Sequence, residues 1–107
     1  MARLGDSFLN FVYSLAMTRW IGEPQGLKVS DRILADVAKK TGVRSMLPRR
    51  TARGEIANSI EALIVQAWLT GVITIDETVR LMEKQMEDPS EAIARVVVNI
   101  LKKMNCT

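Results

Sequence analysis

The stretch RLGDSFLNFVYSLA, residues 3–16, is mainly apolar, as a core segment is, but it contains an isolated carboxylate. After Arg3, Asp6 is the one charged side chain of the stretch. Apolar residues recur at the three- and four-residue spacing of a helix with one buried face: Phe8, Phe11, Val12 and Leu15. We therefore expect a helix from Gly5 to about Trp20. The isolated carboxylate of Asp6 on this helix needs a group that neutralises its charge.

The rest of the chain predicts four more helices and no strand. The expected ranges are Asp31–Lys40, about Glu55–Leu69, Thr74 to about Glu87, and Pro89–Met104. Ser30 and Gly42 suit the N-cap and C-cap of the first of these, and Thr74 with Glu77 forms a capping-box pattern. Asp88 is placed to cap the last helix. The predicted class is all-α with five main helices.

Composition limits the kinds of protein to consider. With 107 residues and 48% hydrophobic content, we expect a single domain over residues 1–107. The absence of histidine excludes His-based catalysis and the usual zinc sites. A lone Cys106 cannot form an internal disulfide, and the weakly charged segment 56–75 is interrupted by polar residues, so a cytoplasmic protein without a membrane span is expected. The net charge of +3 is compatible with an anionic partner.

A second isolated acid repeats the situation of Asp6. Glu61 is the one charge between Ile56 and Ile75, and it lies at helical spacing from apolar residues. Burying an ionised carboxylate costs several kcal/mol or more unless it is paired, hydrogen-bonded or bound to a metal. One explanation is structural, with Asp6 at a helix N-terminus and Glu61 bridged to an Arg. The other explanation is that both acids bind one divalent metal.

Two motifs resemble the ribonuclease III family. The segment LGDSFLNF (residues 4–11) resembles the signature helix of its catalytic domain, and ANSIEALIVQAWLTG (residues 57–71) resembles its second signature. The resemblance implies a ribonuclease III-like helical domain that cuts double-stranded RNA as a homodimer. It further implies that Asp6 and Glu61 are the catalytic residues and hold Mg²⁺, or Mn²⁺ in its place.

Two positions depart from the family pattern. Ala2 stands where family members carry Glu, and Asn58 stands where they carry Asp. The amide oxygen of Asn58 is then expected as a weaker third metal ligand. The same two acidic residues are absent from the compact mini-ribonuclease III branch. That branch lacks an appended double-stranded RNA-binding domain and is similar to enzymes that trim ribosomal RNA precursors. The chain resembles that branch, or an archaeal relative of it, so no appended domain is expected.

The segment RSMLPRRTARGE, residues 44–55, predicts a basic loop before the helix that carries Glu61. Its arginines are our candidates for binding the phosphates of double-stranded RNA: Arg44, Arg49, Arg50 and Arg53. Guanidinium groups suit phosphate oxygens, and double-stranded RNA is recognised mainly by shape and by backbone contacts. The alternative is a solvated loop with no partner.

Two rival functions remain open. The segment ILADVAKKTGVR (residues 33–44) has the spacing of a helix-turn-helix DNA-binding module, although Pro48 would fall inside its recognition helix. The other rival is a catalytically inactive ribonuclease III fold that acts as an RNA-binding or scaffold protein.

A set of apolar residues near the C-terminus predicts either core or a partner groove, and the family resemblance associates such a surface with the homodimer. Its members are Met82, Met86, Val96, Val97, Ile100, Leu101 and Met104.

Overall fold

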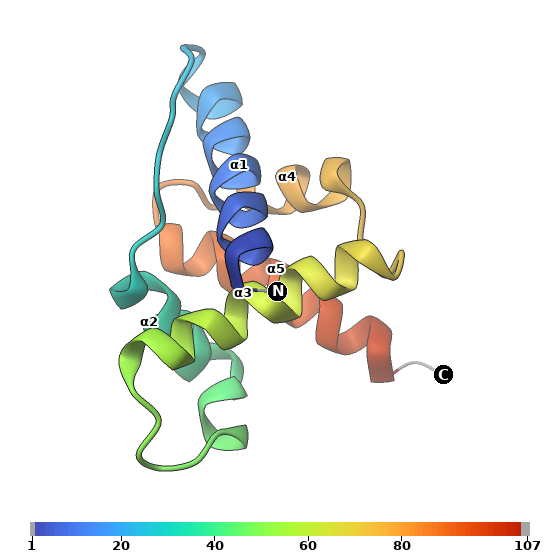
Figure 1. Cartoon of the computed structure of the whole chain (residues 1–107). Helices are drawn as coiled ribbons and strands as arrows, with labels where there is room; N and C mark the ends of the chain where they lie inside the picture. The colour runs from blue at the N-terminus through green and yellow to red at the C-terminus, as the bar shows by residue number, and fades with distance from the viewer. Residues whose placement is uncertain (1, 106–107) are drawn as a thin grey trace.

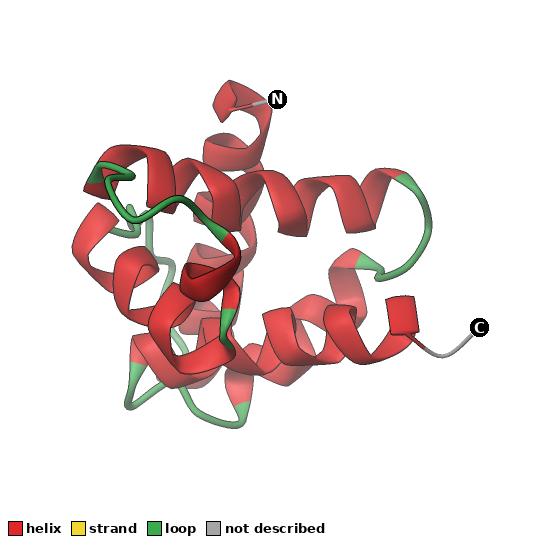
Figure 2. Cartoon of the chain, turned by 90° about the horizontal axis from the view of Figure 1, so that it is seen from below, coloured by secondary structure: helices red, strands yellow, loops and turns green. Residues whose placement is uncertain are grey.

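The computed structural model describes residues 2–105, with side chains from residue 3, and this part of the chain consists of helices and loops without a strand (Figures 1 and 2). The helices are α1 (Ala2–Ile21), α2 (Asp31–Thr41), the short 3-10 helix η1 (Val43–Met46), α3 (Arg53–Leu69), α4 (Ile75–Glu83) and α5 (Pro89–Asn105). The predicted all-α class with five main helices is therefore confirmed. No helix within the described residues is both long and apolar enough to cross a membrane.

The predicted helix ends are set by the expected side chains. Ser30, Thr74 and Asp88 each accept a hydrogen bond from the backbone N–H three residues further on, which satisfies a donor of the first helical turn. Gly42 ends α2 with a φ of 84°, a left-handed conformation that glycine adopts without a steric penalty.

Two helix boundaries and one buried face differ from the prediction. α1 begins at Ala2, and α4 ends at Glu83 and not at Glu87. Residues 84–88 instead form two tight turns, which bury Met86 in the core. Phe11 was expected on the inner face of α1, but its side chain is 54% exposed.

The core lies where α1 and α2 pack on α3 and where α4 and α5 close the other side (Figure 1). Phe8 of α1 stacks on Trp68 of α3, with ring centroids 4.6 Å apart, and this contact fixes the crossing of the two helices. The C-terminal apolar set is largely part of this core, as one of its two interpretations predicted, because five of its seven members are buried: Met82, Met86, Val96, Val97 and Ile100. Only Leu101 and Met104 keep appreciable exposure, so this set does not form a docking surface.

An extended connection, residues 22–30, runs alongside α1 (Figure 1). Polar side chains at four-residue spacing on α1 hold it: Asn10 accepts from the N–H of Val29 at 2.8 Å, and Ser14 and Thr18 accept from backbone N–H groups further back along the connection. This stripe explains why α1 carries polar residues on a face that is partly covered. It also fixes where α2 begins relative to α1.

The fold contradicts the rival interpretation of a helix-turn-helix module. Gly42 is followed by η1, a single short turn, and then by a loop that continues to Ala52. A recognition helix would have to start directly after Gly42, and the next α-helix begins only at Arg53.

Candidate active site

A glycine sets how closely α1 approaches α3. Gly5 is buried, and a Cβ built on it would lie 2.9 Å from the carbonyl oxygen of Glu61 and 3.1 Å from the Glu61 Cβ. Only a residue without a side chain permits this approach, because real Cβ atoms do not come so close to a backbone carbonyl. The two segments that carry the isolated acids therefore meet at one point.

Asp6 follows Gly5 and lies at this crossing. Its Oδ1 accepts a hydrogen bond from the Asn10 side-chain nitrogen at 3.2 Å, and the Asn10 oxygen in turn accepts from the N–H of Val29. Asn10 is thus held from both ends and fixes the orientation of the Asp6 carboxyl group. Asn10 was not predicted as a site residue, although its place four residues after Asp6 on a helix is a signal for a contact with that acid.

Glu61 is 5% exposed, and its side chain forms no ion pair with any described residue. Burial raises the pKa of its carboxyl group to about 7, with further upward contributions from the hydrogen bond and the charge of Asp6 and from the charge of Asp31. Lys28 opposes this shift weakly. Glu61 is therefore partly protonated near neutral pH, and it faces Asp6.

The structural explanation of the two acids is not supported. Because α1 begins at Ala2, Asp6 lies beyond its first turn, where the helix dipole acts most strongly. Glu61 faces another acid and not an arginine. Two carboxyl groups in contact repel each other when both are ionised, so the pair requires a proton or a cation between its members.

Asn58 lies one turn before Glu61 on α3, and it is exposed. Within residues 3–105 no group of three or more acidic, histidine or cysteine side chains is placed to hold a metal. The available donors are therefore the two carboxyl groups and, one turn away, the Asn58 amide. This set fits Mg²⁺, which takes oxygen ligands, keeps several waters and is often held by one or two carboxylates together with substrate phosphates.

The four arginines predicted in the basic loop have different surroundings, and two of them lie in helices: Arg44 in η1 and Arg53 at the first residue of α3. Arg44 is half-buried, and its guanidinium donates to the backbone carbonyls of Leu47, Pro48 and Arg49 at 3.5, 3.2 and 2.8 Å. These hydrogen bonds stabilise the conformation of the loop. Arg49 and Arg50 are exposed, and neither forms an ion pair with a described residue.

Arg53, also exposed, lines a hollow of about 250 Å³ between α2 and the start of α3. Arg32 and Lys39 of α2, which from the sequence could widen the basic patch, line the same hollow. Asp36 is the one acid there, and it is paired with Lys40 at 3.4 Å. The hollow therefore presents three cations that have no ion-pair partner among the described residues.

The described residues thus form an all-α domain in which two acids face each other where α1 crosses α3. A protein-family model described as Ribonuclease III matches residues 1–106. The chain therefore belongs to the ribonuclease III family, as its two motifs predicted. This membership indicates an RNA-processing nuclease or a related function. A comparison with curated protein sequences found no significant match.

Proposed function

We propose that this protein is a Mg²⁺-dependent endoribonuclease that cuts double-stranded or structured RNA. The observation that carries the proposal is the contact between the Asp6 and Glu61 carboxyl groups at the Gly5 crossing. A buried carboxyl group that faces a second acid and has no ion-pair partner among the described residues is costly to fold, and such groups are often found at functional sites.

Each group has a distinct role in the proposed mechanism. Asp6 and Glu61 would hold the metal, with Asn58 as a weaker ligand, and Asn10 would keep the Asp6 carboxyl group in position. When bound, Mg²⁺ supplies activation of a water molecule and stabilisation of the charge that develops on the phosphate. Arg49, together with Arg50 and Arg53, would bind neighbouring phosphates of the duplex through paired N–H donors.

The test is cleavage of a long labelled RNA duplex by the purified protein, with and without Mg²⁺. We expect Glu61→Gln to leave the helical circular dichroism unchanged and to abolish cleavage. The matched control is Glu23→Gln, which removes an exposed acid outside the site and should cleave as the wild type does. Equal turnover in the wild type and in Glu61→Gln would refute the assignment. Ribosomal RNA precursors are the natural substrates we propose to compare with an unrelated duplex.

A second candidate function is RNA binding without cleavage. It is favoured by the lack of a third acidic ligand in the described part of the chain. The same assay separates the two functions. If the protein is a scaffold, the wild type and Glu61→Gln bind the duplex with equal affinity, and neither protein cuts it.

We also propose that the protein acts as a homodimer. Leu4 and Phe11 lie seven residues apart on one face of α1, and their side chains are 45% and 54% exposed. Large apolar side chains on a shared face favour association with a second protein surface. Light scattering should give twice the mass of one chain. Phe11→Ser should lower the measured mass toward that of a single chain. A monomer at micromolar concentration would contradict this part of the proposal.

A further inference from the structure

Asp31, the first residue of α2, lies beside the face of α3 that carries Asn58 and Glu61. Its Oδ2 would be 3.8 Å from a Cβ built on Gly54. Gly54, Asn58 and Glu61 follow one another at four- and three-residue spacing, so they share one face of α3. The charge of Asp31 also acts on Glu61, because it helps to raise the pKa of that carboxyl group. Asp31 thus lies near both ends of the stretch in which Asn58 stands.

The position of Asp31 depends on the contacts that also orient Asp6. Asn10 donates to Asp6 Oδ1 at 3.2 Å and accepts from the N–H of Val29 at 2.8 Å. Val29 precedes Asp31 by two residues, and the connection enters α2 beside α3 (Figure 1). A single side chain therefore links the backbone that carries Asp31 with the carboxyl group of Asp6.

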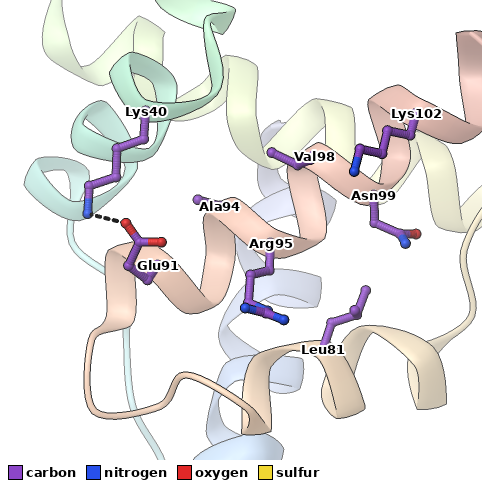
Figure 3. A pocket seen from close by; sticks show the side chains of 8 residues that line it. All are labelled: Lys40, Leu81, Glu91, Ala94, Arg95, Val98, Asn99 and Lys102. Atoms are coloured by element: carbon purple, nitrogen blue, oxygen red, sulfur yellow. Dashed lines mark ion pairs between the residues drawn. The ribbon is translucent and has the colours of Figure 1, made fainter.

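Asp31 is exposed and forms no ion pair with any described residue, although Lys28 and Arg32 lie close to it in the sequence. The ion pairs that the described residues of α2 do form lie toward its other end, around Lys40, which contacts Glu91 at 3.0 Å (Figure 3). The carboxylate of Asp31 is therefore available to accept hydrogen bonds from a group outside the chain.

The charges that act on Glu61 are mainly negative. Asp6 and Asp31 both raise its pKa, and Lys28 is the one opposing cation, with the weakest effect. Glu61 is 5% exposed and has no ion-pair partner among the described residues, so this region favours a bound cation. Within residues 3–105 no three acids are close enough to bind one ion directly. Mg²⁺ keeps several waters, however, and groups outside its ligand shell accept hydrogen bonds from such waters.

We propose that Asp31 is a positioning residue of the candidate site, whose carboxylate accepts a hydrogen bond from a water molecule on the cation that Asp6 and Glu61 hold. This inference rests on the proposed metal site and adds a group from α2 to it. Asp31 supplies negative charge beside the neutral amide of Asn58, and it orients the water without binding the metal itself.

Calorimetric titration of the full chain with Mn²⁺ at pH 8 tests the proposal. Asp31→Asn keeps the shape of the side chain but removes its charge, and it should weaken Mn²⁺ binding at least about tenfold. Asp31→Glu keeps a carboxylate and should recover most of the affinity. The matched control is Glu55→Gln, because Glu55 is exposed in the first turn of α3 as Asp31 is in the first turn of α2. This variant should bind Mn²⁺ as the wild type does.

Two further measurements distinguish a contact with a bound water from other effects of the substitution. In EDTA at pH 8, Asp31→Asn should melt at a temperature no lower than that of Glu55→Gln, because the lost charge no longer repels Glu61. In 1 M KCl, where the Debye length is about 3 Å, the lower affinity of Asp31→Asn should persist. A hydrogen-bonded contact survives this screening, whereas the effect of a distant charge does not.

The outcomes separate this inference from the metal site on which it rests. If the wild type binds no Mn²⁺, the proposed metal site fails and the role of Asp31 fails with it. If the wild type binds Mn²⁺ and Asp31→Asn binds it equally well, only the role of Asp31 is overturned. It is also overturned if Glu55→Gln loses as much affinity, if the loss disappears in 1 M KCl, or if Asp31→Asn melts well below Glu55→Gln.

Discussion

Gly5 and Glu61 touch through their backbones, since a Cβ on Gly5 would lie 2.9 Å from the Glu61 carbonyl oxygen. This contact serves the fold and the candidate site together. It brings α1 onto α3 closely enough for the neighbouring Asp6 to meet the Glu61 side chain. A change at Gly5 should therefore affect both stability and the acid pair.

Replacing Gly5 with Ala should destabilise the protein by about 1–3 kcal/mol, because the added methyl group meets backbone that cannot yield without moving a helix. Urea unfolding followed by circular dichroism measures the change. Gly54→Ala is the matched control, since Gly54 lies in α3 and its added Cβ would make only an ordinary contact at 3.8 Å with Asp31. That variant should gain up to about 1 kcal/mol from helix propensity. Equal stability of the two variants would show that α1 and α3 do not pack closely at Gly5.

Stability should fall as the pH rises through the range in which Glu61 ionises. The folded protein holds the Glu61 proton up to a pKa of about 7, whereas the unfolded chain loses it near 4.5. Between these values the folded state binds more protons, so the free energy of unfolding decreases with rising pH. The full loss is about 3 kcal/mol, at 1.36 kcal/mol for each pKa unit.

Urea unfolding in EDTA from pH 5 to pH 8.5 measures this slope. The chain has no histidine, so few other groups titrate in this range. Glu61→Gln should flatten the profile and should be more stable than the wild type above pH 7. A wild-type profile that rises with pH over this interval would contradict the raised pKa of Glu61.

Divalent cations should stabilise the folded protein, and more so at pH 8 than at pH 5.5. At the lower pH a proton occupies the acid pair, and a cation must displace it. Thermal melts with and without millimolar Mg²⁺ or Mn²⁺ measure the effect independently of any cleavage. Asp6→Asn and Glu61→Gln should lose the shift, whereas Glu23→Gln should keep it. A shift of the same size in all four proteins would place the cation elsewhere.

The helical frame could be predicted from the sequence because it depends on local chemistry. Caps such as Ser30 and Thr74 act within a few residues, and they were found where expected. The end of α4 could not be predicted, since the turns after Glu83 follow from burying Met86 in a core built by distant helices. The exposure of Phe11 likewise depends on which neighbours α1 acquires.

The candidate site was predictable only in part. Asp6 and Glu61 stood out because a single charge in an apolar segment is unusual at any position. The contribution of Asn10 depends on a hydrogen bond from Val29, 19 residues away, and helical spacing alone does not reveal such a bond. Similarly, only the structure distinguishes Arg44, which binds loop carbonyls, from the exposed Arg49.

Introducing an acid at position 58 should strengthen metal binding at the proposed site. Asn58→Asp places a third carboxylate one helical turn before Glu61, and an added negative charge near a divalent cation should raise its affinity at least about tenfold. Calorimetric titration with Mn²⁺ at pH 8 measures the gain. Gln66→Glu adds the same charge at an exposed position of α3, and it should leave the affinity unchanged. Equal gains in both variants would indicate a general charge effect and not a ligand at position 58.

The basic loop should contribute to duplex binding in a salt-dependent manner. In a Glu61→Gln background without metal, replacing Arg49 and Arg50 with Ala should weaken binding of an RNA duplex about tenfold at 0.1 M salt. The slope of log affinity against log salt should become shallower by about one to two, because fewer counterions are released from the phosphates. The control is Arg80→Ala with Lys84→Ala, which removes the same charge from exposed positions of α4 and its end. If both double variants bind alike at every salt concentration, the loop is a solvated surface without a role in RNA binding.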